Sequence, residues 1–323
     1  MDFLEAIAAR SRGRGYRIVF PEGCDARIIE AAIILQHDGS ARPILLGAKK
    51  EIVDAAIAAG LDAGTLESED PSCSPLLEEI AGFYVSKRRG ISHGAALRMV
   101  RRNLIFAGAL VASGKADAMI AGAASTTADV ISAAALTIGY RKGISTPSSF
   151  FIMMLPDGRV FFYADCAVNV NPDAGQLADI AISTADSYRR LTGNQPKVAL
   201  LSFSTRGSAQ HPAALKVAEA VQIVKKRNPD LMVDGEFQVD TALVPQVATR
   251  KLKDPGPVAG NADVLIFPNL DAGNIAYKLT QYLAGARAIG PILQGFARPV
   301  SDLSRGASTE DIVQVARILC SQI

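Results

Sequence analysis

The chain has 323 residues, a length that favours two domains over a single hydrophobic core. Hydrophobic residues make up 49% of it and charged residues 20%, a balance that excludes disordered and fibrous proteins. The formal net charge of +2, the low aromatic content of 6% and the absence of tryptophan argue against nucleic-acid binding, which needs a dense basic face or stacking rings.

One local basic cluster departs from this balance, and it consists of Lys87, Arg88, Arg89, Arg98, Arg101 and Arg102. It fits a solvated helix face or a site for a polyanionic small molecule, and the sequence leaves both open.

Nothing in the sequence indicates a membrane protein or an exported one. The N-terminal stretch carries Asp2 and Glu5 and has no long apolar run, so it does not resemble a signal peptide. No segment has the roughly eighteen consecutive apolar residues that a membrane span requires. The four cysteines lack CxxC spacing, which fits a reducing compartment and offers no zinc site. We therefore expect a cytoplasmic protein without a membrane partner.

The first part of the chain alternates short apolar runs with helical segments. RIVF at 17–20, an Ala/Ile-rich segment at 25–38 and PILLG at 43–47 form a strand–helix–strand pattern, which is typical of parallel sheets. Helices are expected within 74–112, and DAMIAG at 117–122 predicts a further strand. This part is therefore expected to be an α/β domain.

A second α/β domain is expected to begin near residue 143. Two apolar runs around Pro156-Asp157-Gly158 predict a β-hairpin over 148–165. Asn171-Pro172 is expected to open a long helix, with Asn as its cap and Pro as its first residue. Further strands are predicted in four apolar runs, at 198–204, 231–235, 263–268 and 288–293.

The last helix is predicted over 308–320, where apolar residues recur with helical spacing. We expect it to return to the first domain. The resulting division is 1–142 plus 297–323 for the first domain and 143–296 for the second, with residues 295–307 at a cleft between them.

The stretch SRGASTED at 304–311 has two interpretations that are compatible with each other. Ser308 followed by Asp311 resembles a capping box, a purely structural signal. The same helix start favours an anion, and Arg305 adds a guanidinium suited to phosphate oxygens. Asp311 beside a bound phosphate would then be placed to accept a proton from an incoming nucleophile.

A second candidate stretch is AGAASTTADV at 121–130, where a strand end is followed by the three hydroxyls of Ser125, Thr126 and Thr127. A hydroxyl-rich helix start is a potential anion cradle, although the Gly-Lys-Ser/Thr end of a P-loop is missing. Simple N-capping explains the same residues.

Metal binding has weaker support. Asp234, Glu236 and Asp240 offer oxygen ligands for a divalent ion, but Gly235 makes a turn the simpler explanation. The three histidines are far apart in the sequence, and His211-Pro212 is expected to begin a helix. Cys166 and Cys320 are expected to be small buried residues. We expect no metal site.

Long stretches of the chain, in order, resemble the phosphate acetyltransferase family, including the related C-terminal domain of large malic enzymes. The matching stretches are VFPEG, ADAMIAGAASTTAD, SSFFIMMLPDG, DCAVNVNPDAGQLADIAISTAD, LLSFSTRGSAQHP, LMVDGEFQVDTAL, ADVLIFPNLDAGNIAYKL and IGPILQGFARPVSDLSRGASTEDIV. The resemblance implies two α/β domains with a central cleft, like the isocitrate and isopropylmalate dehydrogenases, and a homodimer formed through the second domain.

The same resemblance implies reversible acetyl transfer between coenzyme A and phosphate, with CoA as a substrate, no tightly bound cofactor and no metal in the chemical step. It assigns catalysis to Ser304, Arg305 and Asp311. Asp311 would deprotonate the CoA thiol, Arg305 would hold the phosphate and Ser304 would stabilise the tetrahedral centre. Ser125, Thr126, Thr127 and Lys278 are the candidate substrate-binding residues.

The sequence also departs from the family pattern. Ser132 and Tyr282 stand where, or near where, many members carry arginines, and Ala307 replaces a cysteine. Missing cations put CoA binding in question, and Lys87, Arg88 or Arg141 are candidates to compensate. Transfer of a propionyl or butyryl group, or a degenerate module that senses acyl-CoA, are the alternatives.

Overall fold

The computed structural model describes residues 3–88 and 90–323, so Arg89 of the basic cluster lies outside the described residues. Contacts divide the chain into two compact units, Met1–Arg141 with Phe296–Ile323, and Lys142–Gly295. We call them unit 1 and unit 2 and describe each by itself.

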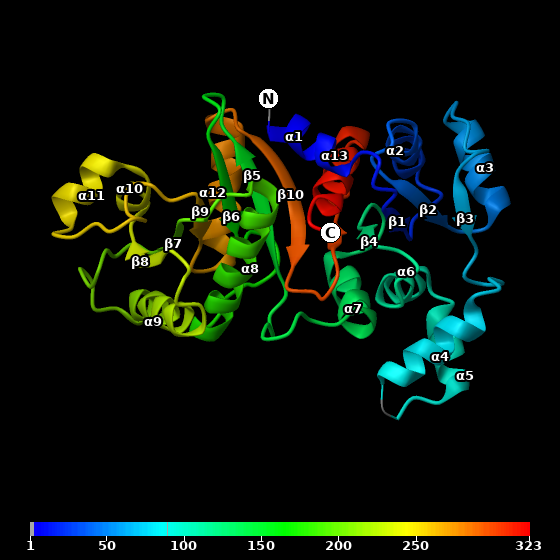
Figure 1. The fold of residues 1–323 in the computed structure, drawn as a ribbon, viewed down its shortest axis with the longest axis horizontal. Coiled ribbons are helices and arrows are strands. Elements are labelled where there is room, and N and C mark those ends of the chain that lie inside the picture. The colour runs from blue at the N-terminus through cyan, green and yellow to red at the C-terminus, as the bar shows by residue number, and fades with distance from the viewer. Residues whose placement is uncertain (1–2, 89) are drawn as a thin grey trace. The chain divides into compact units, whose positions relative to one another are not determined.

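Unit 1 combines a parallel sheet with helices on both faces (Figure 1). Its strands are β1 (Arg17–Phe20), β2 (Arg42–Leu46), β3 (Glu67–Glu69), β4 (Ala118–Ala121) and β11 (Val300–Asp302). Its helices are α1 (Phe3–Ser11), α2 (Ala26–His37), α3 (Lys49–Ala58), α4 (Leu77–Lys87), α5 (His93–Val100), α6 (Asn103–Ala112), α7 (Thr127–Thr137) and α13 (Thr309–Cys320).

The strands of unit 1 are ordered β3-β2-β1-β4-β11, and every neighbouring pair is parallel. From β1 the chain builds outward through β2 and β3, and then crosses to the other side of β1 with β4. This reversal is a topological switch point, where open α/β sheets place ligands beyond the carboxyl ends of the strands.

Burial explains why these segments form the centre of unit 1. All four residues of β4 are buried, as are Ile18, Val19 and Phe20 of β1, because a parallel sheet is covered on both faces. Helix α13 contacts α1 and α2 on one face, whereas α6 and α7 contact each other on the opposite face, with α4 and α5 packed against α6 (Figure 1). The last helix thus packs in the unit where the chain begins.

Unit 2 is built on a mixed sheet. Its strands are β5 (Ser148–Met154), β6 (Val160–Ala164), β7 (Val198–Leu201), β8 (Val233–Phe237), β9 (Val264–Ile266) and β10 (Arg287–Gln294). Its helices are α8 (Ala174–Thr192), α9 (Pro212–Arg227), α10 (Val239–Leu243), α11 (Pro245–Lys251) and α12 (Leu270–Leu283).

The strand order in unit 2 is β10-β5-β6-β9-β7-β8, in which β5 runs antiparallel to both neighbours and the remaining pairs are parallel. The predicted hairpin is confirmed as β5 and β6. Helices α8 and α9 contact each other and the strands, and aromatic stacking helps to fill the core, with the rings of Phe151 and Tyr277 4.1 Å apart.

The predicted start of the long helix is wrong. Its cap is Asp173, whose carboxylate accepts from the Gln176 N–H while the Gln176 side chain accepts from the Asp173 N–H. This reciprocal capping box outcompetes Asn171, whose side-chain oxygen accepts from Lys216 at 3.1 Å instead. His211 and Pro212 do begin a helix, as predicted.

The α/β class is confirmed, and the arrangement of two domains around a cleft stays a prediction. Within the described residues, no helix is both long and apolar enough to cross a membrane.

Candidate active site

Three loops follow the carboxyl ends of β1, β4 and β11, which are neighbours at the switch point of unit 1. They comprise residues 21–25, 122–126 and 303–308. Because the three strands are parallel, these loops leave the same edge of the sheet. The two stretches that the sequence singled out, 121–130 and 304–311, therefore meet at one edge.

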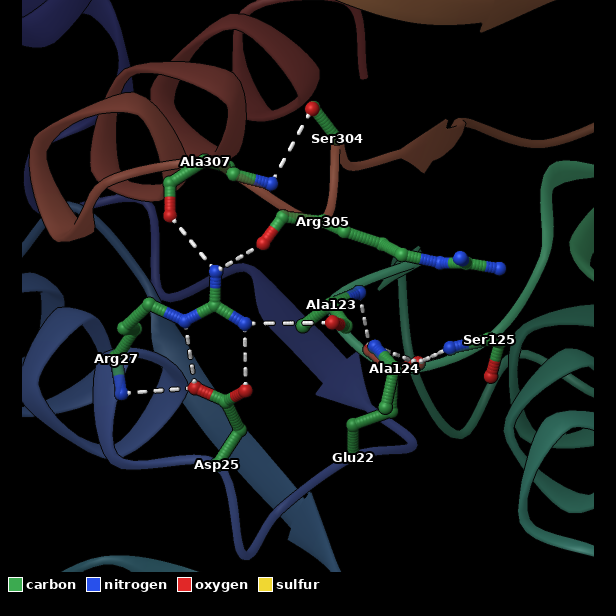
Figure 2. A network of polar contacts seen from close by, with 10 residues as sticks. Glu22, Asp25, Arg27, Ala123, Ala124, Ser125, Ser304, Arg305 and Ala307 are labelled. Carbon is green, nitrogen blue, oxygen red and sulfur yellow. Dashed lines mark hydrogen bonds and ion pairs between the residues drawn. The ribbon is translucent and has the colours of Figure 1, made fainter.

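Glu22 fixes the loop after β4. The backbone N–H groups of residues 123, 124 and 125 donate to its carboxylate at 2.7, 2.9 and 2.6 Å. Figure 2 shows this carboxylate beneath the loop. An anion cradle was one of two interpretations of this turn, but its N–H groups already bind an anion of the protein itself. Glu22 is therefore a structural anion that shapes the loop.

Arg27 joins all three loops. It forms a two-point ion pair with Asp25, the cap of α2, through Nε at 3.0 Å and Nη2 at 2.7 Å. Its Nη1 donates to the carbonyls of residues 305 and 307 at 2.7 and 3.0 Å, and Nη2 donates to that of residue 123 at 3.3 Å (Figure 2). Burial acts to raise the pKa of Asp25, but the hydrogen bonds and charge of Arg27 outweigh it and lower that pKa.

Arg305 contrasts with Arg27, because its side chain makes no hydrogen bond or ion pair with any described residue. The residue is exposed, and only its backbone carbonyl is engaged, by Arg27. Figure 2 shows the guanidinium extending away from Arg27, toward the side of the view where Ser125 is drawn. A permanently charged fork without a protein partner is suited to bind an oxyanion.

Ser304 precedes this arginine and is also exposed. Its hydroxyl oxygen accepts from the Gly306 N–H at 3.3 Å (Figure 2). Accepting this bond leaves the hydroxyl hydrogen available for another acceptor. Ser304 can therefore donate to a ligand beside Arg305.

The predicted capping box of α13 is confirmed. Ser308 accepts from the Asp311 N–H at 3.2 Å, and Oδ2 of Asp311 accepts from the Ser308 N–H at 3.0 Å and from its hydroxyl at 2.8 Å. Within the described residues Oδ1 of Asp311 accepts no hydrogen bond. One oxygen thus orients the carboxylate, and the other is left to accept a proton.

The three hydroxyls after β4 have different environments. Thr126 caps α7 and bonds to Asp129, and Thr127 donates to Asp302 at 2.5 Å. Ser125 donates its N–H to Glu22, but its hydroxyl has no partner among the described residues. N-capping therefore explains Thr126, and only Ser125 keeps a hydroxyl free for a ligand.

Asp302 is a buried acid below these loops, with only 2% of its surface exposed. Its Oδ1 has no hydrogen-bond partner among the described atoms, and it lies so close to Gly122 that a Cβ there would be 2.3 Å away. Burial, with a smaller contribution from the charge of Glu22, raises the pKa of Asp302 to about 6 against the opposing hydrogen bond from Thr127. An acid with its pKa near neutrality thus lies under the site.

Several sequence candidates belong to unit 2. Lys278 is on α12 of unit 2, with its Nζ 5.0 Å from the centre of the Tyr277 ring. Among the proposed metal ligands, Asp234 pairs with Arg206 and Lys225, and Asp240 pairs with Lys251. Glu236 accepts from the Ser204 hydroxyl and the Gly207 N–H, both at 2.7 Å, so these acids are held by protein groups. Cys166 and Cys320 are buried, as predicted.

Sequence reasoning assigned no role to Glu22, Asp25, Arg27 or Asp302. The available signal was their position, since Glu22 and Asp25 follow β1 at the switch point and Asp302 ends β11. Their partners are distant in sequence, 278 residues for the bond from Arg27 to Arg305. Only the fold could reveal those pairs.

Unit 1 is thus a doubly wound α/β fold with its candidate site at the switch point. The family model described as "Phosphate acetyl/butaryl transferase" matches residues 2–320. A phosphate acetyltransferase from Acetivibrio thermocellus is 45% identical, over 100% of this chain and 98% of its own length. The chain belongs to the phosphate acetyl/butyryl transferase family.

Solved structures agree with this assignment. A phosphotransacetylase from Streptococcus pyogenes superposes with a TM-score of 0.93 at 38% identity, covering 99% of this chain and 97% of that one. A 4-hydroxythreonine-4-phosphate dehydrogenase from Klebsiella pneumoniae, at 13% identity and a TM-score of 0.55, covers 96% of this chain and 98% of its own and shares the fold alone. This likeness is compatible with the expected dehydrogenase-like fold.

Proposed function

We propose that the chain is a phosphate acetyltransferase, which transfers an acetyl group reversibly between coenzyme A and inorganic phosphate in a ternary complex. The observation that carries the proposal is the exposed guanidinium of Arg305, which has no partner among the described residues and lies beside the Ser304 hydroxyl and the capped start of α13. A helix N-terminus and a free guanidinium together favour a phosphate group. Relatives named phosphate acetyltransferase, similar over the full length, support the same activity.

In the direction that makes acetyl-CoA, the thiol of CoA gives its proton to Oδ1 of Asp311. The sulfur then bonds to the carbonyl carbon of acetyl phosphate and forms a tetrahedral centre. The bond between that carbon and the phosphate oxygen breaks, phosphate leaves, and the proton passes from Asp311 to it. No covalent enzyme intermediate and no tightly bound cofactor are needed in this scheme.

Each proposed role follows from a contact. The two bonds from Ser308 to Oδ2 fix the Asp311 carboxylate, so Oδ1 is the oxygen that moves the proton. Arg305 holds the phosphate, and its charge stabilises the negative charge that develops as phosphate leaves. Ser304 donates to the oxygen of the tetrahedral centre, and the free hydroxyl of Ser125 is the best-supported substrate contact after β4.

For CoA we propose that Arg88 compensates for the missing arginine at position 132. The Nε of Arg88 donates to the carbonyl of Leu136 at 3.0 Å, one turn beyond Ser132 on α7. Its guanidinium also lies over the ring of Tyr84, 5.6 Å from the ring centre. Arg88 therefore brings a positive charge to the helix that carries Ser132, where it can pair with a CoA phosphate.

The remaining expectations stay predictions. They are a cleft between two domains, with 143–296 as the dimerisation domain, a homodimer, a cytoplasmic location, and Lys278, Thr126 and Thr127 as substrate-binding residues.

The activity test mixes the purified protein with acetyl phosphate and CoA and follows the absorbance of the thioester bond. We expect acetyl-CoA to form without added metal. Propionyl phosphate and butyryl phosphate, assayed in parallel, measure the acyl preference. A protein that binds acetyl-CoA but forms no thioester would be a sensing module instead.

Arg305→Ala is expected to lower kcat by about 10²- to 10³-fold, because one electrostatic donor to the transition state is lost. The measurement is steady-state kinetics at saturating acetyl phosphate and CoA. Arg298→Ala is the matched control, since Arg298 is an exposed arginine of unit 1 outside the loops. Full activity in Arg305→Ala would refute the role assigned to this residue.

A further inference from the structure

Unit 1 has a hollow at the edge of its sheet opposite the candidate active site. Strands β1, β2 and β3 are parallel, and their first residues are Arg17, Arg42 and Glu67. The hollow has a volume of about 430 Å³, and Arg42 and Glu67 line it, together with Gln36, Thr65 and turns at Gly13 and Gly39. The loops at 21–25, 122–126 and 303–308 leave the other edge, so the proposed reaction does not use this hollow.

The charged residues that line this hollow are Arg42 and Glu67. Arg17 is neutralised by Glu67 at 2.5 Å, and its Nη1 donates to the carbonyl of Lys115. Arg42 is exposed, and its side chain has no hydrogen bond or ion pair with any described residue. The turn at Gly13, whose N–H donates to the Gly39 carbonyl at 2.9 Å, is flanked by Arg12 and Arg14, which are also exposed and without a described side-chain partner. Among the charged residues of the lining, Arg42 therefore has no described partner, whereas Glu67 is paired with Arg17.

Neutral polar groups accompany the charges. The Gln36 amide donates to the Thr65 hydroxyl at 3.1 Å, which orients both side chains. Glu67 uses one oxygen for Arg17, and its second oxygen accepts no hydrogen bond from the described residues. A free carboxylate oxygen beside an amide and a hydroxyl suits a ligand that carries hydroxyl groups. The same carboxylate repels a ligand whose polar groups are all negatively charged.

We propose that this hollow is a second ligand site, which binds a small phosphorylated polyol. Arg42 binds the phosphate. Gln36, Thr65 and Glu67 bind the hydroxyls. The volume admits a molecule of the size of a sugar phosphate, and pockets for small molecules begin at about 300 Å³.

The test is isothermal titration calorimetry of the full chain with glycerol 3-phosphate as the probe and glycerol as the unphosphorylated control. We expect the phosphorylated probe to bind and glycerol to give no heat. Arg42→Ala is expected to weaken binding by about 10-fold or more, as loss of a hydrogen bond to a charged group implies. Gln36→Ala, at an exposed amide, is expected to weaken it by about 3- to 10-fold.

Two variants separate this site from other sources of binding. Arg305→Ala removes the guanidinium that is proposed to bind phosphate in the active site. We expect this variant to keep the wild-type affinity for glycerol 3-phosphate. Arg250→Ala removes an exposed arginine of unit 2 and serves as the charge-matched control. The proposal is overturned if the wild-type protein gives no binding heat, if Arg42→Ala binds as tightly as Arg250→Ala, or if binding is lost in Arg305→Ala and kept in Arg42→Ala.

Discussion

Arg27 is the side chain on which the geometry of the candidate site depends most. It bonds to backbone carbonyls of two loops while Asp25 holds it at the start of α2. Carbonyls are fixed points of the main chain, so a planar fork that reaches three of them sets the path of the segment carrying Ser304 and Arg305. We regard Arg27 as a positioning residue, since its donors face protein atoms.

Arg27→Lys is expected to lower kcat by about 10-fold or more, because a lysine keeps the charge but cannot reach all of these partners, and small misplacements of reacting groups are costly. Arg27→Ala is expected to lower the free energy of unfolding by about 1 to 3 kcal/mol as well. Kinetics and thermal unfolding of both variants check this. A lysine variant with wild-type kcat would show that the fork has no positioning role.

Asp302 and Glu22 are two acids placed under the same loops with different environments. Glu22 is satisfied by three N–H groups, whereas Asp302 is buried with one oxygen unpaired. Burial raises the pKa of Asp302 from 3.8 to about 6. A carboxyl group whose pKa rises on folding binds its proton more tightly in the native state, so it stabilises the fold at low pH and weakens it once ionised.

The free energy of unfolding is therefore expected to contain a component that falls as pH rises from about 4 to about 6 and stays low above that. Asp302→Asn removes this component. The free energy of unfolding of the variant, relative to that of the wild type, should therefore rise by about 1 to 3 kcal/mol between pH 4 and pH 8. Denaturant unfolding of both proteins across this range measures the difference, and parallel curves would contradict the raised pKa.

Helices α2 and α13 run side by side from the candidate site toward the opposite edge of the sheet. Three polar contacts join them along their length, from Arg27 to the carbonyl before the cap of α13, from Thr309 to Glu30 at 2.6 Å, and from Arg317 to Asp38. Their apolar faces pack on the core, with Ile28 and Ile312 fully buried. The loop that carries Arg305 is thus held by the helix that follows it as well as by Arg27.

Helix α7 carries Ser132, where the sequence analysis expects a departure from the family pattern. Ser132 is exposed, and Arg88 reaches the carbonyl of Leu136 on the same helix. Arginine is a good helix former, so the substitution Ser132→Arg does not disturb the helix.

Ser132→Arg is expected to lower the KM for CoA by about 3- to 10-fold, since it adds a charged partner for a CoA phosphate. The effect should shrink at high salt, because exposed charges are screened. Ser132→Gln is the neutral control of similar length. A KM for CoA that stays unchanged in Ser132→Arg would place the CoA phosphates away from α7.

Unit 2 carries an apolar helix face that its own core does not cover. Along α12 only Gly273 is buried, and the exposed residues of this face are Ile275, Leu279, Tyr282 and Leu283. Tyr282 and Leu283 are 77% and 81% exposed. Residues with helical spacing that stay apolar and exposed are typical of an interface, which supports the proposed homodimer through this unit.

The double variant Leu279→Glu with Leu283→Glu is expected to be a monomer where the wild type is a dimer, because charges buried in an interface have no partner. Sedimentation velocity reports the change. Ile57→Glu on α3 of unit 1 is the control, since Ile57 is an equally exposed apolar residue, at 68%. A double variant that keeps the wild-type mass would move the interface elsewhere.

Local chemistry was sufficient for most of the elements. Short apolar runs predicted β1 and β4, the turn residues at 156–158 predicted the hairpin, and Ser308 with Asp311 predicted the start of α13. Each of these signals comes from residues that are neighbours in the sequence. The one failed helix start shows the limit, because Asn171 and Asp173 are both good caps. A contact from Lys216, far along the chain, engages Asn171.

The sequence by itself determined most of the elements, the family resemblance and the polar groups of Ser304, Arg305 and Asp311, since these depend on short stretches of the chain. The tertiary structure alone decided that Glu22 occupies the N–H groups after β4, that Arg27 fixes the loop of Arg305, and that a hollow lined by Arg42 and Glu67 lies at the opposite edge of the sheet of unit 1. These contacts join residues about 100 or more positions apart or strands paired by the fold, and no local pattern encodes such partners.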